Sequence, residues 1–234
     1  MGLPVITLPT YTLKLPSDGK QITYRPFMVR EEKVLLLAMQ EDGDNIVDAI
    51  KKVISECTFN KLDVDMLPQV DLEYVFINIR NKSMGEGFDV HHKCLECGAT
   101  NTLSLDLSKV YVKRSTEEVE PVIKIRDDMW VTMRYPTFDA MFELSKAPEN
   151  VDVNLSVLAS CVTALVHGDT KYNMMDYTQK EVVDFIEQFS KEELSMMEKF
   201  FESAPKLAFD TTYKCAKCGE ENQISLSGVD DFFV

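Results

Sequence analysis

Basic residues are scarce in this chain of 234 residues: 25 Lys and Arg stand against 39 Asp and Glu, so the formal net charge is −14. No block of basic residues offsets the acidic excess locally. A surface of this sign repels phosphate groups. We therefore expect no binding to nucleic acid or to anionic membranes.

Long apolar runs are also missing. The longest, such as Val34 to Met39, fall far short of the roughly 20 residues that a membrane-spanning helix needs. The first residues lack the basic stretch followed by an apolar stretch that marks a secretory signal. We expect a soluble protein that stays in the cytoplasm of the cell that makes it.

Signals of catalysis are absent too. The sequence has no glycine-rich phosphate loop and no nucleophile elbow, and its carboxylates are too numerous for any one pair to indicate a site. Glycine and proline number only 9 each, which excludes collagen-like and low-complexity chains. The length predicts one or two ordinary globular domains.

The first half alternates between strand and helix patterns. Apolar and polar residues alternate from Leu3 to Phe27 around a turn at Ser17 to Gly19, which predicts short strands. Helical spacing of apolar residues follows in 34–39, 46–57 and 72–79. A strand, a cysteine-rich turn and a second strand with alternating leucines at 103–107 complete this half.

The second half has the same order of elements. Strand-like alternation over 122–135 precedes helical patterns over 137–146 and 151–166. Two capping boxes, Thr178 with Glu181 and Ser190 with Glu193, predict the starts of two further helices. Two strands around a second cysteine-rich turn then follow.

The two cysteine-rich regions also match residue by residue. Aligning 87–108 with 208–229 at a constant offset of 121 gives nine identities: Phe88/Phe209, Asp89/Asp210, Lys93/Lys214, Cys94/Cys215, Cys97/Cys218, Gly98/Gly219, Asn101/Asn222, Ser104/Ser225 and Leu105/Leu226. We predict an α+β protein of internally duplicated helical units, each ending in a strand-knuckle-strand element, with short N-terminal β-strands. The first repeat would span 1–118 and the second 119–234, with about 11 extra residues between Val166 and Thr178. The alternative is two unrelated halves that each carry a knuckle.

Cys94, Cys97, Cys215 and Cys218 have the Cys-x-x-Cys-Gly spacing of zinc knuckles. In such a knuckle a tight turn aims two thiolates at one metal, and two knuckles supply a full tetrahedral set. A separation of 117 residues between the knuckles is compatible with one shared site, because the entropic cost of closing a loop rises only logarithmically with its length. We predict a structural Zn²⁺ site formed by these four cysteines.

Other roles for these cysteines stay open at this stage. A redox Cys-x-x-Cys usually begins a helix, where the dipole lowers the thiol pKa, whereas strand patterns flank both pairs here. Reduced metal-free thiols and a site completed by another chain are further alternatives. His91 and His92 face Thr212 and Tyr213 in the alignment, so we expect ordinary strand residues there.

The remaining candidates have plain structural interpretations. Cys57 and Cys161 lie on apolar helical stripes and are expected to be inert core thiols. His167, beside Gly168, is expected to cap the end of a helix. A catalytic zinc needs an open coordination position, and four thiolates leave none, so we expect no enzyme.

Four stretches in the first third carry a family resemblance: Leu15 to Lys20, Tyr24 to Ala38, Cys57 to Phe59 and Asp71 to Tyr74. They resemble the baseplate hub subunit and hub-assembly proteins of T4-like contractile-tailed bacteriophages. The second half is similar to that family only in length and general layout.

The resemblance implies a non-enzymatic structural or chaperone-like assembly component of the baseplate hub. Such a protein is made in the infected bacterial cytoplasm, works beside hub and tape-measure proteins, and either stays in the virion tail or leaves after assembly. The alternatives are an acidic zinc-ribbon adaptor for a transcription or other host partner, and a metal hydrolase. The acidic, aromatic segment Asp230 to Val234 is a candidate contact, unless it packs on its own domain.

Overall fold

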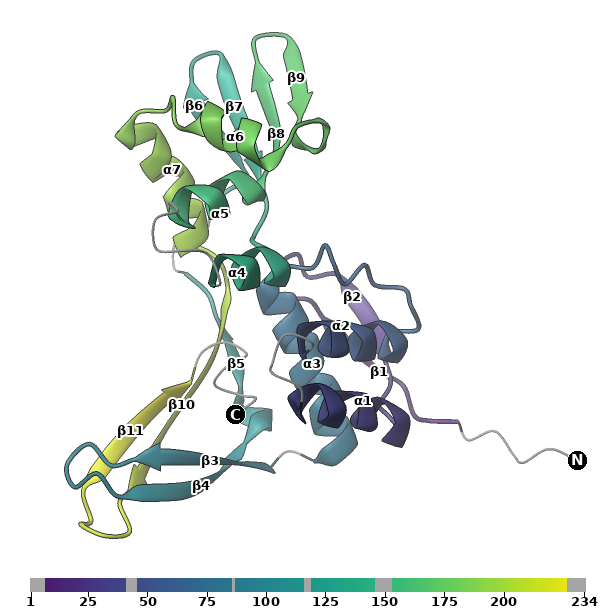
Figure 1. The fold of residues 1–234 in the computed structure, drawn as a ribbon, viewed down its shortest axis with the longest axis vertical. Helices are drawn as coiled ribbons and strands as arrows, with labels where there is room; N and C mark the ends of the chain where they lie inside the picture. Colours follow the sequence, from purple (N-terminus) through teal and green to yellow (C-terminus); the bar gives the residue numbers. More distant parts are fainter. Residues whose placement is uncertain (1–6, 41–45, 86, 116–118, 146–152, 227–234) are drawn as a thin grey trace, which may run out of the picture. The chain divides into compact units, whose positions relative to one another are not determined.

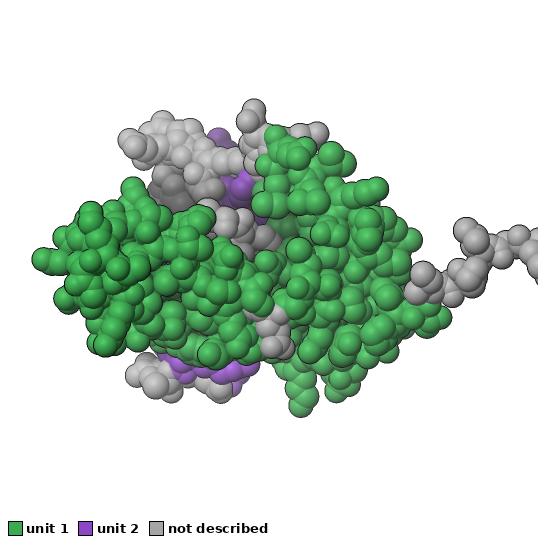
Figure 2. All heavy atoms as spheres, turned by 90° about the horizontal axis from the view of Figure 1, so that it is seen from below, with its two compact units in different colours: residues 1–64, 70–113, 206–234 green, residues 65–69, 114–205 purple. Residues whose placement is uncertain are grey.

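The computed structural model describes residues 7–40, 46–85, 87–115, 119–145 and 153–226 of the chain. It contains helices and small antiparallel sheets, which confirms the predicted α+β class (Figure 1). The chain divides into two compact units, coloured separately in Figure 2. Unit 1 comprises residues 1–64, 70–113 and 206–234, and unit 2 comprises residues 65–69 and 114–205.

Unit 1 begins with the predicted hairpin. Strand β1 (Tyr11–Lys14) pairs with β2 (Gln21–Tyr24), and Gly19 supplies the positive φ of 72° that the turn requires. Three helices follow: α1 (Val29–Gln40), α2 (Ile46–Cys57) and α3 (Gln69–Met84). The residues between the hairpin and α1 are fixed to the helices, since the backbone N–H of Arg25 donates to the carbonyl of Cys57 at 3.0 Å.

A buried ion pair holds the start of α1. The guanidinium of Arg25 lies 2.9 Å from Glu31, whose side chain is only 2% exposed, and the backbone N–H of Met28 donates to the same carboxylate. Burial alone would raise the pKa of Glu31. The hydrogen bonds from Arg25, Arg30 and Met28 outweigh it and lower this pKa to about 2. The carboxylate therefore stays ionised inside the unit.

Two further hairpins complete unit 1. One joins β3 (Gly87–Lys93) to β4 (Thr100–Asp106), and the other joins β10 (Lys206–Lys214) to β11 (Glu221–Leu226). After the short helix η1 (Leu107–Lys109), strand β5 (Tyr111–Lys113) pairs antiparallel with the first residues of β10. Their apolar side chains share a core with α3, made of Val70, Ile77, Phe88, Leu105, Leu107, Leu207 and Phe209.

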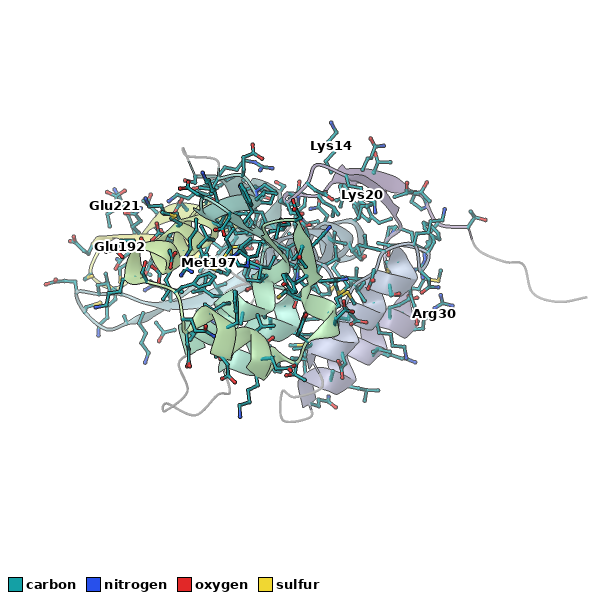
Figure 3. The ribbon with its side chains drawn as sticks, turned by 90° about the horizontal axis from the view of Figure 1, so that it is seen from above. Lys14, Lys20, Arg30, Glu192, Met197 and Glu221 are labelled. Atoms are coloured by element: carbon teal, nitrogen blue, oxygen red, sulfur yellow. The ribbon has the colours of Figure 1, made fainter. Side chains whose placement is uncertain are left out.

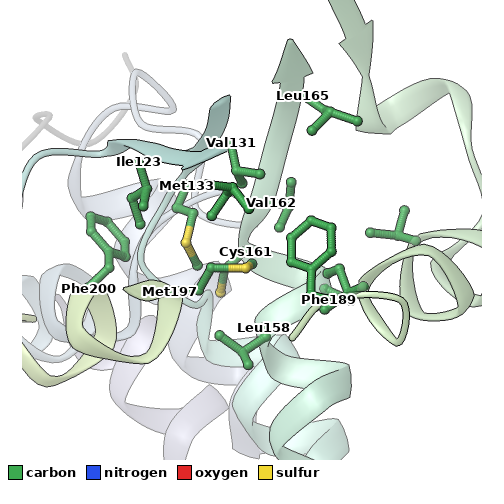
Figure 4. Close-up of a cluster of buried hydrophobic side chains, with 14 of the residues drawn as sticks. Ile123, Val131, Met133, Leu158, Cys161, Val162, Leu165, Phe189, Met197 and Phe200 are labelled. Carbon is green, nitrogen blue, oxygen red and sulfur yellow. The ribbon is translucent and has the colours of Figure 1, made fainter. Parts of the chain in front are cut away.

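The described residues of unit 2 form a four-stranded antiparallel sheet with four helices. The strands, in the order β6-β7-β8-β9, are Val122–Arg126, Met129–Met133, Val162–His167 and Thr170–Asn173. The helices are α4 (Phe138–Ser145), α5 (Val153–Cys161), α6 (Gln179–Ile186) and α7 (Lys191–Glu202), with a single turn, η2 (Met174–Asp176), before α6. Figure 4 shows the core, in which Met197 of α7, Cys161 and Met133 converge.

Both predicted capping boxes are confirmed. Thr178 and Ser190 accept hydrogen bonds from the backbone N–H groups of Glu181 and Glu193, and each glutamate returns a bond to the backbone of its cap. Glu193 also pairs with Arg126 of β6, which ties α7 to the sheet. The Arg126 guanidinium and the Ser190 N–H lower the pKa of Glu193 to about 2.

Two predictions for this region are wrong. The helix expected over 151–166 ends at Cys161, and Val162–His167 is a strand that pairs with β7 on one side and β9 on the other. The β-branched residues of this run suit a central strand. His167 consequently ends a strand, where its Nε2 lies 3.1 Å from Asp128, and does not cap a helix.

The compact units do not coincide with the expected repeats at 1–118 and 119–234. The reason is that β10, which lies in the expected second repeat, pairs with β5 at the end of the expected first repeat. Repetition in sequence and compactness in space are different properties, so the duplication itself stays a prediction.

Charged side chains are exposed on both units. Lys14 and Lys20 on the first hairpin, Arg30 on α1 and Glu192 on α7 are all exposed (Figure 3). Within the described residues, no helix is long and apolar enough to cross a membrane.

Candidate metal centre

The four predicted ligands lie in the turns of the two hairpins β3-β4 and β10-β11, which Figure 1 shows with their ends close together. Each turn is closed by the same bonds: Cys94 N–H to Ala99 at 2.9 Å, and Cys215 N–H to Glu220 at 2.8 Å. Gly98 and Gly219 follow with φ of 67° and 78°. These left-handed positions explain the glycine after each second cysteine.

The hairpins also pair their strands in the same register. Phe88 faces Leu105 and Asp89 faces Ser104, and their counterparts 121 residues later, Phe209 with Leu226 and Asp210 with Ser225, face each other likewise. The two turns therefore present their cysteines from equivalent scaffolds.

The four sulfur atoms converge on one point. All lie within 4.8 Å of one another, with Cys94 and Cys218 at 3.7 Å and Cys97 and Cys215 at 3.6 Å. A disulfide would need about 2.05 Å, so these thiols are not bonded to each other. Zinc–sulfur bonds of about 2.3 Å would place tetrahedral ligands about 3.8 Å apart, which fits the observed separations. The four cysteines could therefore hold a metal ion.

Backbone donors stabilise the first thiolate of each knuckle. The N–H groups of Cys97 and Glu96 lower the pKa of Cys94, and those of Cys218 and Lys217 help to lower the pKa of Cys215 to about 6.

Cys218 behaves in the opposite way. The N–H of Glu220 lowers its pKa, but burial and the neighbouring thiols outweigh this bond and raise the pKa to about 12. Four thiols this close repel one another when ionised, and a divalent cation is the group that would remove this repulsion.

Two asparagines bridge the knuckles reciprocally. Asn101 Nδ2 lies 3.6 Å from the Cys215 sulfur, and its Oδ1 accepts from the N–H of Ala216 at 3.0 Å. Asn222 Nδ2 lies 3.5 Å from the Cys94 sulfur, and its Oδ1 accepts from the N–H of Leu95 at 3.0 Å. Each asparagine thus contacts the knuckle that it does not belong to.

The sequence analysis assigned no role to these asparagines. The available signal was the identity Asn101/Asn222 in the 121-residue alignment. Nothing in the pattern shows that each side chain crosses to the opposite hairpin, because that depends on how the hairpins meet.

The two neighbouring histidines are not metal ligands in this arrangement. His91 Nδ1 lies 3.1 Å from Thr102 on the paired strand, and His92 Nδ1 lies 2.9 Å from the hydroxyl of Tyr213 on the other hairpin. The expectation of ordinary strand residues holds for His91. His92 has the additional function of linking the two hairpins.

Cys57 and Cys161 lie away from this centre. Both are fully buried at the ends of α2 and α5, and burial raises the pKa of their thiols to about 12 and about 11. Their burial confirms the expectation of core thiols, and a raised pKa favours the unreactive protonated form.

Unit 2 contains a pocket of about 400 Å³. It is lined by Met129, Leu165, His167, Tyr172, Met174, Tyr177, Glu181, Val182 and Phe185. Two polar side chains in it already have partners, since His167 contacts Asp128 and Glu181 holds the cap of α6. A metal site needs at least three His, Cys, Asp or Glu side chains close together. Among the described residues, the four cysteines are the side chains that meet this condition.

The family described as T4 bacteriophage base plate protein matches residues 8–234. The chain belongs to this family. No curated protein and no solved structure matches the chain. The baseplate family match covers the described parts of both units and confirms the resemblance to baseplate proteins of T4-like phages seen in the first third of the sequence.

Proposed function

We propose that this baseplate-family protein is a non-enzymatic structural or assembly component of the tail baseplate hub, stabilised by one structural Zn²⁺. The observation that carries the proposal is the convergence of four thiols from two separate hairpins in a chain that matches the baseplate family over 8–234. The family match favours this function over the acidic adaptor.

The donor set supports zinc as the metal. Four thiolates in a tetrahedral arrangement suit Zn²⁺ or iron, and the paired Cys-x-x-Cys turns are typical of structural zinc. All four positions would be filled by protein, so no site remains for an activated water. Both Cys-x-x-Cys pairs follow strands and not helix starts, which disfavours the redox alternative.

The proposed role of the metal is to join two weak elements. A two-stranded hairpin is only marginally stable alone in water. Here the hairpins β3-β4 and β10-β11 meet at their turns through few apolar residues, because most of their shared core lies at the other end, around Phe88, Leu207 and Phe209. A metal bonded to both turns would fix the ends that the core does not reach.

The proposed partners are other phage tail proteins, including hub and tape-measure proteins. Support for a binding role comes from α1, whose outward side chains Val29, Leu36, Leu37 and Met39 are each more than half exposed. A helix that is apolar on its exposed face usually contacts another molecule. The proposed contact at 230–234 lies outside the described residues.

We also propose that the chain arose by duplication. Beyond the matched hairpins, the backbone N–H of Arg25 donates to Cys57, and that of Arg134 donates to Cys161 at 2.8 Å. Both bonds join the residue after a hairpin to the end of the second helix. Strand β9 and the turn η2 lie between Val166 and Thr178, where the extra residues of the second copy were expected.

Metal analysis of protein purified without added zinc tests the site, with one zinc per chain as the expected result. Cys94→Ser and Cys215→Ser should each abolish binding, while Leu95→Ser, at an 86% exposed position in the same turn, should not. Two equivalents, or none in reduced protein, would contradict a single shared site. Phage carrying a deletion of this gene tests the function: normal tails would overturn the hub assignment.

A further inference from the structure

Asn101 and Asn222 are almost fully buried residues, at 7% and 3% exposure, and their side-chain amides contact both knuckles. Each amide makes three contacts of known direction. Its Oδ1 accepts from a backbone N–H of the opposite knuckle, and its Nδ2 donates to a carbonyl of its own turn at 3.0 Å and to a cysteine sulfur of the opposite knuckle.

The orientation of each amide follows from these partners. A backbone N–H only donates, so the atom that faces Leu95 or Ala216 must be the oxygen. The NH₂ group is then the one that faces the sulfur and the turn carbonyl. Every hydrogen-bonding group of the two amides is used, which is the condition for a buried polar side chain to be stabilising.

We propose that Asn101 and Asn222 are positioning residues of the metal site, each fixing and stabilising the first thiolate of the opposite knuckle. This inference rests on the proposed zinc site. Asn101 serves Cys215, and Asn222 serves Cys94, so neither knuckle has a complete ligand environment without the other hairpin.

The physical reason lies in the charge of the site. Four thiolates with one Zn²⁺ carry a net charge of −2, and buried negative charge must be met by donors. The asparagine N–H supplies such a donor to the sulfurs of Cys94 and Cys215, the two buried residues among the four proposed ligands. Partners that orient metal ligands in this way typically change metal affinity by about 10- to 100-fold.

The test is a zinc-affinity measurement by chelator competition on the full chain. Asn101→Ala and Asn222→Ala should each weaken binding by about 10- to 100-fold while keeping one zinc per chain. Thr102→Ala and Gln223→Ala, exposed neighbours on the same strands, are the matched controls and should bind like the parent protein.

Two further variants separate positioning from folding. Asn101→Asp and Asn222→Asp keep the shape and the oxygen that accepts from the backbone, but they lose the donor to sulfur. Both should lose affinity at least as strongly as the alanine variants. In Co²⁺-loaded protein the sulfur-to-metal charge-transfer band should move to longer wavelength, because a thiolate without its N–H donor gives up an electron more easily.

The outcomes are distinguishable. If the parent protein binds one zinc and the asparagine variants match Thr102→Ala and Gln223→Ala in affinity and in the cobalt band, this inference is wrong and the zinc site stands. If the parent protein binds no zinc, the proposed site and this inference both fail. If an alanine variant does not fold, the aspartate variant decides: an unchanged affinity and cobalt band overturn the inference.

Discussion

His92 and Tyr213 occupy equivalent positions of the two hairpins, 121 residues apart, and they contact each other. The Nδ1 atom of His92 lies 2.9 Å from the Tyr213 hydroxyl, and the rings meet edge to face with centroids 5.6 Å apart. Equivalent positions contact one another only near an axis that exchanges them. With the reciprocal asparagine bonds, this pair indicates a local twofold relation between the knuckles.

Removing the proposed zinc should loosen the two hairpins selectively. A chelator added to reduced protein should speed hydrogen exchange of amides in β3, β4, β10 and β11, because the bond between the knuckles is lost. Amides of β7 and β8 in unit 2 serve as the internal control and should keep their exchange rates. Equal acceleration in both units would contradict the local role of the metal.

Adjacent methionines of α7 should differ sharply in their contribution to stability. Met197 is fully buried in the core of unit 2 (Figure 4), whereas Met196 is 40% exposed. Met197→Ala should lower the free energy of unfolding by about 2–5 kcal/mol, since it leaves a cavity. Met196→Ala should cost less than about 1 kcal/mol. Denaturant unfolding measures both, and similar costs would show that the described packing of α7 is wrong.

The carboxylate of Glu193 should make unit 2 sensitive to acid. Its pKa is lowered from 4.5 to about 2, so its contribution to folding is complete above about pH 4.5 and is lost as the pH falls toward 2. The stability difference between the parent protein and Glu193→Gln should therefore shrink over this range. Glu192→Gln, at an exposed position of the same turn, should show no such trend. A pH-independent difference for Glu193→Gln would refute the ion pair with Arg126.

The knuckle glycines should resist substitution for a conformational reason. An added Cβ at Gly98 or Gly219 would meet no atom within 4 Å, but φ of 67° and 78° disfavours other residues. Gly98→Ala and Gly219→Ala should each cost about 1–2 kcal/mol and weaken zinc binding. Gly87→Ala, where φ is not positive and the nearest atom lies at 3.9 Å, is the control. A cost at Gly87 equal to that at Gly98 would contradict this explanation.

Local signals predicted much of this fold. The capping residues Thr178 and Ser190 and the alternation over 122–135 each depend on neighbours a few residues away, and the structure confirms them. The cysteine spacing predicted which four side chains would lie together, because each knuckle is itself a local turn.

Features that depend on contacts between residues far apart in the sequence could not be predicted from local patterns. The run 162–167 is central in its sheet, and only its last residue, His167, is exposed, so the run lacks the alternation that separates a strand from a helix. Strand β5 has only three residues, and its partner β10 follows more than ninety residues later. The bridging role of Asn101 and Asn222 likewise appears only when the hairpins meet.

The pairing of Lys113 with Lys206 indicates the order in which the two knuckles are synthesised and brought together. The chain leaves unit 1 at β5 and returns beside it at β10, so the second knuckle is synthesised only after unit 2 is complete. Until then Cys94 and Cys97 offer a metal only two ligands. Folding of unit 2 brings its two ends together. This lowers the entropic cost of pairing β5 with β10, because the long segment between them is already ordered. The proposed zinc would therefore be captured late, and a bound ion would identify a chain in which both units have been synthesised and folded.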